Sequence, residues 1–104
     1  MLLKFAIQDF KDDREFKNLS EQTIRNYMIQ LNEFQEFCTS KDILNVEDVT
    51  VNTVKSYFLY CMKSKNNNPV TVNTKIKNLK AFFIIKNLKR FLQMFLGIIQ
   101  SNQY

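Results

Sequence analysis

The chain of 104 residues contains one glycine and one proline. Tight turns depend on these two residue types, so a sandwich or barrel built from many short hairpins is excluded. Helices joined by short loops remain, and the sequence therefore predicts an all-α fold. At this length the chain is large enough for one modest hydrophobic core and too small for two independent ones.

Histidine is absent, and there are only two cysteines. Without histidine the chain cannot complete a Cys–His zinc site or a Cys–His nucleophile. Cys38 and Cys61 each lie in an apolar helical stripe, where a free cysteine is usually a buried, reduced core residue. No spacing in the sequence assembles a base, a nucleophile and an oxyanion donor. We therefore expect no metal, no cofactor and no catalytic residue in this chain.

Long apolar runs are also missing. The longest uninterrupted one is "AFFII" at residues 81–85, far below the roughly 18 residues that a membrane-spanning helix requires. The first residues lack the apolar core of a signal peptide. We therefore expect a cytoplasmic protein with no membrane partner.

Acidic residues are confined to the first half of the chain. Residues 1–50 hold six Lys/Arg and ten Asp/Glu, a net charge of −4, whereas residues 51–104 hold nine Lys/Arg and no acid. Such asymmetry predicts a surface in the second half that binds a polyanion. A lysine-rich surface that is merely solvated is the alternative.

Apolar residues at helical spacing predict a first helix within residues 2–18, with Leu3, Ile7 and Phe10 facing inward together with Leu2 or Ala6. After the break "NLS", the Ser20 hydroxyl can cap a second helix. The apolar residues of this second helix recur every three or four positions: Ile24, Tyr27, Met28, Leu31, Phe34 and Cys38. Its opposite, polar face carries Gln22, Arg25, Asn26, Glu33 and Glu36.

Residues 39–49 show too little periodicity for a long helix, and we expect them to fill the core from a loop through Ile43, Leu44, Val46 and Val49. The tetrapeptide "TVNT" then occurs at 50–53 and again at 71–74. In both copies the first threonine suits the N-cap position and the second the N3 position. This predicts a third helix over residues 51–65, ended by "NNNP", and a fourth from Thr71. The fourth helix should bury Val72, Ile76, Leu79 and Phe83, with Phe82 at the edge.

The outer surface of the fourth helix is the clearest functional feature of the sequence. Asn73, Lys77 and Lys80 recur at i, i+4 and i+7, which places them on one flank beside the apolar stripe. Ammonium groups neutralise phosphates, and an asparagine amide can pair with an adenine edge in a major groove. A solvated helix surface also carries lysines, so this flank alone leaves both interpretations open.

The apolar pattern changes after Phe83. If the fourth helix continued, four later apolar residues would lie about 180° from its inward residues: Leu88, Leu92, Phe95 and Ile99. One straight helix cannot bury both stripes in a small core. Either the chain breaks near Lys86 or the last segment docks on something that this domain does not supply. We therefore treat residues 84–104 as an atypical C-terminal tail, helical or frayed.

Three segments, taken in order, resemble the N-terminal core-binding domain of tyrosine recombinases, the phage-integrase and Xer-like family. They are "LSEQTIRNYMIQLNEFQEFC", "NVEDVTVNTVKSYFLYC" and "NNNPVTVNTKIKNLKAFF". The resemblance covers about residues 5–83. The pattern of the family's second helix is matched by Leu19, Ser20, Thr23, Ile24, Tyr27, Leu31 and Phe34. A later pattern is matched by Pro69, Thr71, Asn73, Lys75, Leu79, Lys80, Phe82 and Phe83.

This resemblance implies a four-helix SAM-like domain, here residues 1–83, that forms one half of a clamp around the recombination site. Its second and fourth helices would approach the major groove of double-stranded DNA. The implied partners are that DNA, the catalytic domain of the same recombinase and other recombinase protomers. The implied DNA-binding residues are Gln22, Arg25, Asn26, Thr71, Asn73, Lys75, Lys77 and Lys80.

The chain departs from the family in two respects. The catalytic domain, with its Arg, Lys, His and nucleophilic Tyr, has no room here, and nothing around Tyr104 could activate a phosphodiester. We therefore expect a non-catalytic DNA-binding domain of a DNA-cleaving and rejoining parent, serving an integrative mobile element. The tail fits the family poorly, which suggests a truncated or frame-disrupted product or a cloning boundary.

A rival interpretation of the same residues is a small helical protein-interaction module. Exposed Ile29, exposed Ile84 and the apolar tail would then dock a partner helix. Salt distinguishes the two functions, because DNA binding weakens steeply with salt and apolar docking does not.

Overall fold

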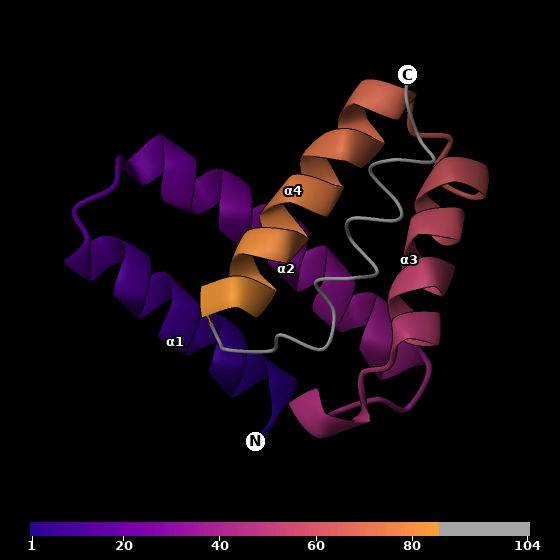
Figure 1. Cartoon of the computed structure of the whole chain (residues 1–104), viewed down its shortest axis with the longest axis horizontal. Coiled ribbons are helices and arrows are strands. Elements are labelled where there is room, and N and C mark those ends of the chain that lie inside the picture. Colours follow the sequence, from indigo (N-terminus) through magenta and orange to yellow (C-terminus); the bar gives the residue numbers. More distant parts are fainter. Residues whose placement is uncertain (86–104) are drawn as a thin grey trace. The chain divides into compact units, whose positions relative to one another are not determined.

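The computed structural model describes residues 1–85, which belong to two compact units divided between Thr50 and Val51. The first unit contains α1 (Leu3–Phe16), α2 (Glu21–Ser40) and the short 3-10 helix η1 (Val46–Asp48). The second contains α3 (Val51–Lys63) and α4 (Pro69–Ile85) (Figure 1). These residues form four α-helices and no strand, so the predicted all-α fold class is confirmed. Within residues 1–85, no helix has both the length and the apolar character needed to cross a membrane.

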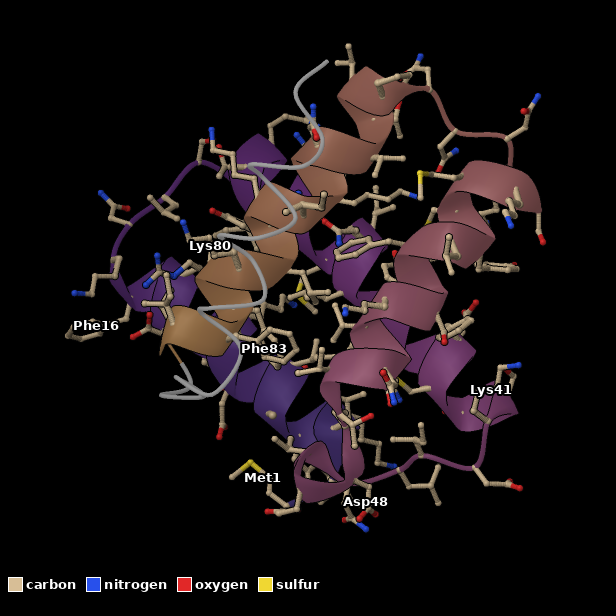
Figure 2. The ribbon with its side chains drawn as sticks, turned by 45° about the vertical axis from the view of Figure 1, so that its right-hand side comes forward. Met1, Phe16, Lys41, Asp48, Lys80 and Phe83 are labelled. Carbon is tan, nitrogen blue, oxygen red and sulfur yellow. The ribbon has the colours of Figure 1, made fainter. Side chains whose placement is uncertain are left out.

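In the first unit, α1 and α2 pack against each other through the predicted apolar faces. The buried side chains of α1 are Leu3, Ala6, Ile7 and Phe10, and those of α2 include Ile24, Leu31, Phe34 and Cys38. The Phe10 and Tyr27 rings meet edge to face, with their centroids 5.2 Å apart. At the end of α1, Phe16 projects outward and is 87% exposed (Figure 2). Spacing at 3.6 residues per turn therefore predicted this helix pair correctly.

Ser20 caps α2 as the sequence predicts. Its hydroxyl oxygen accepts a hydrogen bond from the Thr23 N–H at 3.2 Å, which satisfies one of the donors left without a partner in the first turn. Glu21 adds an acidic side chain at the positive end of the helix dipole. The start of α2 is therefore fixed locally, and with it the positions of the polar side chains in its first two turns.

The segment between α2 and α3 pairs with the N-terminus through its backbone. The Leu3 N–H donates to the Leu44 carbonyl at 2.8 Å, and the Val46 N–H donates to the Met1 carbonyl at 2.9 Å. Val46 and Val49 are buried as predicted, and Ile43 is half-buried. The prediction that Leu44 fills the core is wrong, because its side chain is 51% exposed. In extended backbone, adjacent side chains point to opposite sides, so Ile43 and Leu44 cannot both face inward.

In the second unit, α3 packs against α4. The buried residues of α3 are Thr53, Val54, Tyr57, Phe58 and Cys61, and those of α4 are Val72, Ile76, Leu79, Phe82 and Phe83. The prediction that Phe82 lies at the edge is wrong. Its ring is fully buried, with its centroid 5.4 Å from that of Phe83, because a side chain of this size reaches inward from the flank of the helix.

The start of α4 also corrects the sequence prediction. α4 begins at Pro69, two residues before Thr71, and the side-chain carbonyl of Asn68 accepts a hydrogen bond from the Thr71 N–H at 2.8 Å. Asn68 is therefore the cap, and Thr71 occupies N3. Proline at the first helical position is favourable because its fixed φ suits a helix and its missing N–H would have no partner there. Only the first "TVNT" copy keeps the predicted register, with Thr50 directly before α3.

The loop between α3 and α4 turns through Asn66, whose φ of 55° lies in the left-handed region. Asparagine tolerates this region better than most residues. The Asn67 N–H then donates to the Cys61 carbonyl at 3.0 Å, which ties the loop to the end of α3. The predicted tail begins at residue 84, and its residues from 86 onward lie outside the described part of the chain.

Asn68→Ala should lower the free energy of unfolding by about 1 kcal/mol, because an unpaired N–H would be left in the first turn of α4. Thr71→Ala is the matched control and should cost clearly less, because its hydroxyl does not form the cap. Urea denaturation of both variants measures the difference. If Thr71→Ala lowers the free energy of unfolding as much as Asn68→Ala or more, Thr71 and not Asn68 is the cap.

The Cys38 thiol adds a dependence on pH. Burial raises the pKa of Cys38 from 9.0 to about 12, because the core disfavours the thiolate. The neutral thiol thus contributes to stability fully below about pH 9, and this contribution is lost as the pH rises toward about 12. In urea denaturation across this range, the wild-type free energy of unfolding should fall more steeply than that of Cys38→Ala. If the free energy of unfolding of the two proteins falls equally with pH, the raised pKa of Cys38 is contradicted.

Candidate nucleic-acid interface

One flank of α4 carries the predicted basic surface. Asn73 and Lys77 are exposed and Lys80 is half-buried, and at about 100° per residue the three lie within an arc of about 60°. Lys80 is half-buried beside the apolar stripe of α4, whereas Phe83, one turn later, is fully buried (Figure 2 labels both residues). We call Asn73, Lys77 and Lys80 the basic flank of α4.

The charge around this flank is of one sign. Residues 51–85, the described part of the second unit, contain six lysines and no acidic residue. No ion pair can therefore form among these residues themselves, and the charge of this part of the chain is wholly positive. A surface of this kind attracts a polyanion and releases its counterions on contact.

Thr71 and Lys75, predicted with the same group, lie on the other side of α4. At about 100° per residue, Lys75 is turned by roughly 160° from Asn73 and Lys77, and Thr71 by roughly 120° to 160°. Both side chains are half-buried. The Lys75 ammonium donates to the Asn67 side-chain carbonyl at 2.7 Å and lies 3.6 Å from the Cys61 sulfur. Lys75 therefore ties α4 to the preceding loop.

This role of Lys75 was missed in the sequence analysis. The available signal was the run of three asparagines at 66–68, which offers side-chain acceptors close in sequence to a lysine about two turns into the following helix. Spacing alone did not show that the loop folds back toward α4.

On the first unit, the outward face of α2 carries the other predicted group. Gln22, Arg25 and Asn26 are all exposed, and the Gln22 side-chain N–H donates to the Asn26 side-chain carbonyl at 2.9 Å. The amides are therefore held next to each other one turn apart. Ile29, one turn further along the same face, is 64% exposed.

A groove runs along α1 and α2 beside this face. Its lining includes Lys11, Glu15, Glu21 and Arg25. The Lys11 ammonium lies 3.7 Å from the Glu15 carboxylate, and Glu21 and Arg25 add one charge of each sign. These charges balance, so the groove favours neither an anion nor a cation. The first two turns of α2 thus offer hydrogen-bonding groups with balanced charge, and α4 offers positive charge.

The outward face of α2 and the basic flank of α4 carry groups that bind other molecules through hydrogen bonds and charge. Within residues 1–85, no three His, Cys, Asp or Glu side chains come together in a way that could hold a metal ion. The amides of α2 can donate and accept hydrogen bonds at base edges, and the ammonium groups of α4 can contact phosphates. Each set of groups matches one component of duplex DNA.

Comparison with known protein families gives one result that covers most of the chain. Residues 7–94 match the family model described as phage integrase, N-terminal SAM-like domain. The match includes both the polar start of α2 and the basic flank of α4. No curated protein and no solved structure matches the chain significantly.

Proposed function

Because the chain belongs to the family of phage integrase N-terminal SAM-like domains, we propose that it binds double-stranded DNA at the recombination site of an integrase. In the intact recombinase this domain, residues 1–83, would form one side of a clamp on the attachment site. The catalytic domain of the same protein would close the other side and carry out cleavage and rejoining. Other protomers bound to the same DNA would complete the assembly.

The basic flank of α4 is the observation that carries this proposal. Asn73 and Lys80 are seven residues apart, which corresponds to about 10.5 Å along the helix axis. DNA rises about 3.4 Å per base pair, so the flank spans about three base pairs. Lys77 and Lys80 are placed to contact phosphates, and the Asn73 amide, one turn earlier on the same flank, can reach a base edge.

Thr71 and Lys75 lie on the side of α4 turned away from this flank. A single helix in a groove presents one side to the bases and adjacent phosphates, so both sides cannot make the same contact. Lys75 would also have to leave Asn67, at 2.7 Å, before it could bind a phosphate. We therefore assign DNA contact on α4 to the basic flank and assign Lys75 to holding the start of the helix.

A specific observation also favours protein docking. Ile29 on α2 is 64% exposed and Ile84 on α4 is 48% exposed, so each can supply an apolar contact to a partner. Docking through these residues would weaken little with salt, because it depends on apolar contact. DNA binding through lysines would weaken steeply with salt. A salt titration therefore separates the two functions.

Lys77→Ala and Lys80→Ala should each weaken binding to any duplex by a similar factor. Each should also reduce the slope of log affinity against log salt by about one, because one phosphate contact is lost. Fluorescence anisotropy with a labelled duplex at several salt concentrations measures both quantities.

Two controls make this test specific. Lys55→Ala removes the same charge from an exposed position on α3 and should leave the slope unchanged. Lys75→Ala should also keep the slope but lower the free energy of unfolding by about 1 kcal/mol or more, because Asn67 loses a charged donor. If all four variants change the slope equally, binding depends on net charge alone and the assignment to this flank fails. If the wild-type chain binds no duplex, the proposed function fails.

A further inference from the structure

An exposed isoleucine lies in the middle of the polar face of α2. Ile29 is 64% exposed, whereas the apolar residues that build the core of this helix are turned away from it. At about 100° per residue, Gln22, Asn26 and Ile29 fall within an arc of about 60° and extend about 10.5 Å along the helix. We call these three residues the α2 stripe.

The amides of the α2 stripe are arranged to present one acceptor and one donor. The Gln22 side-chain N–H donates to the Asn26 side-chain oxygen at 2.9 Å, so that oxygen already has a partner. The Gln22 Oε1 atom remains as an acceptor and the Asn26 Nδ2 atom as a donor. In the major groove, adenine presents an N6 donor beside an N7 acceptor. The pair of amides therefore complements adenine.

Ile29 complements the base paired with adenine. The 5-methyl group of thymine is the apolar feature of the major-groove edge, and apolar side chains contact it. Because the α2 stripe is as long as about three base pairs, Ile29 and the amides can read neighbouring pairs in one groove. Resting on the DNA-binding function proposed above, we propose that the α2 stripe selects A·T base pairs, the amides contacting adenine and Ile29 contacting a thymine methyl.

Charges on α2 indicate where this contact begins and ends. Arg25 is exposed beside the amides and can neutralise an adjacent phosphate. Glu36, two turns beyond Ile29 on the same outward face, is exposed and would be repelled by phosphates. DNA contact is thus confined to the first half of α2. The helix reads bases there, and the basic flank of α4 supplies most of the phosphate contacts.

The test begins with selection of duplexes from a randomised library by the wild-type chain, Ile29→Ala, Asn26→Ala and Leu44→Ala. The wild type should enrich A·T pairs at neighbouring positions. Ile29→Ala should lose the preference for thymine at one position, and Asn26→Ala should lose about tenfold of the preference for adenine at a neighbouring one. Leu44→Ala removes an apolar side chain that is 51% exposed in the same unit and away from the stripe, and it should select as the wild type does.

Deoxyuridine in place of the selected thymine removes only the methyl group. Wild-type affinity should then fall roughly fourfold, as expected for one buried methyl, and Ile29→Ala should bind both duplexes equally. If Ile29→Ala selects the same base pairs and is as sensitive to deoxyuridine as the wild type, Ile29 does not read thymine and the proposal is overturned. Selection of G·C pairs by the stripe would overturn it as well.

Three further outcomes identify what failed. If Ile29→Ala abolishes a concentration-dependent self-association in ultracentrifugation and leaves base selection unchanged, Ile29 is a protein contact and the proposal is wrong. Lys77→Ala, measured in parallel, tests the proposed function separately. If Lys77→Ala lowers the salt slope while Ile29→Ala selects as the wild type does, DNA binding stands and only the A·T readout fails. If no sequence is enriched although the wild-type chain binds duplex in the anisotropy assay, only the A·T readout fails, and if the wild-type chain binds no duplex, both fail.

Discussion

The burial of one apolar stripe on α4 decides which of its lysines face solvent. Val72, Ile76 and Leu79 are almost completely buried, and this fixes the rotation of the helix about its axis. Once the rotation is fixed, Lys77 must lie on the outer flank and Lys75 on the other side. Asn68 sets the residue at which the helix starts. The buried stripe and the Asn68 cap together thus determine which side chains α4 presents on its basic flank.

The periodic part of this arrangement could be predicted from the sequence. The inward faces of α1 and α2, the Ser20 cap and the grouping of Asn73, Lys77 and Lys80 all follow from 3.6-residue spacing and the chemistry of short polar side chains. What could not be predicted depends on contacts outside the local pattern. Leu44 is turned outward by backbone pairing with Leu3, and Lys75 is held by a loop residue eight positions earlier. The family pattern placed Lys75 with Lys80, and helix geometry separates them.

Charge is divided between the two units in a way that matches the proposed roles. The described part of the second unit contains six lysines and no acid, so its own charge is wholly positive. On the first unit, Arg25 is accompanied by Glu21, and the first turns of the outward face of α2 carry the Gln22 and Asn26 amides and exposed Ile29. Phosphate contacts supply affinity without sequence information, and base contacts supply specificity. In the proposed division of roles, α4 supplies affinity and α2 supplies specificity.

Amide NMR of the labelled chain, titrated with a duplex at low and then physiological salt, shows which helices meet DNA. We expect chemical shift changes at Asn73, Lys77 and Lys80 and along Gln22 to Ile29, with the changes on α4 decreasing as salt is added. Changes confined to other helices, or changes that follow protein concentration in the absence of DNA, would contradict this expectation.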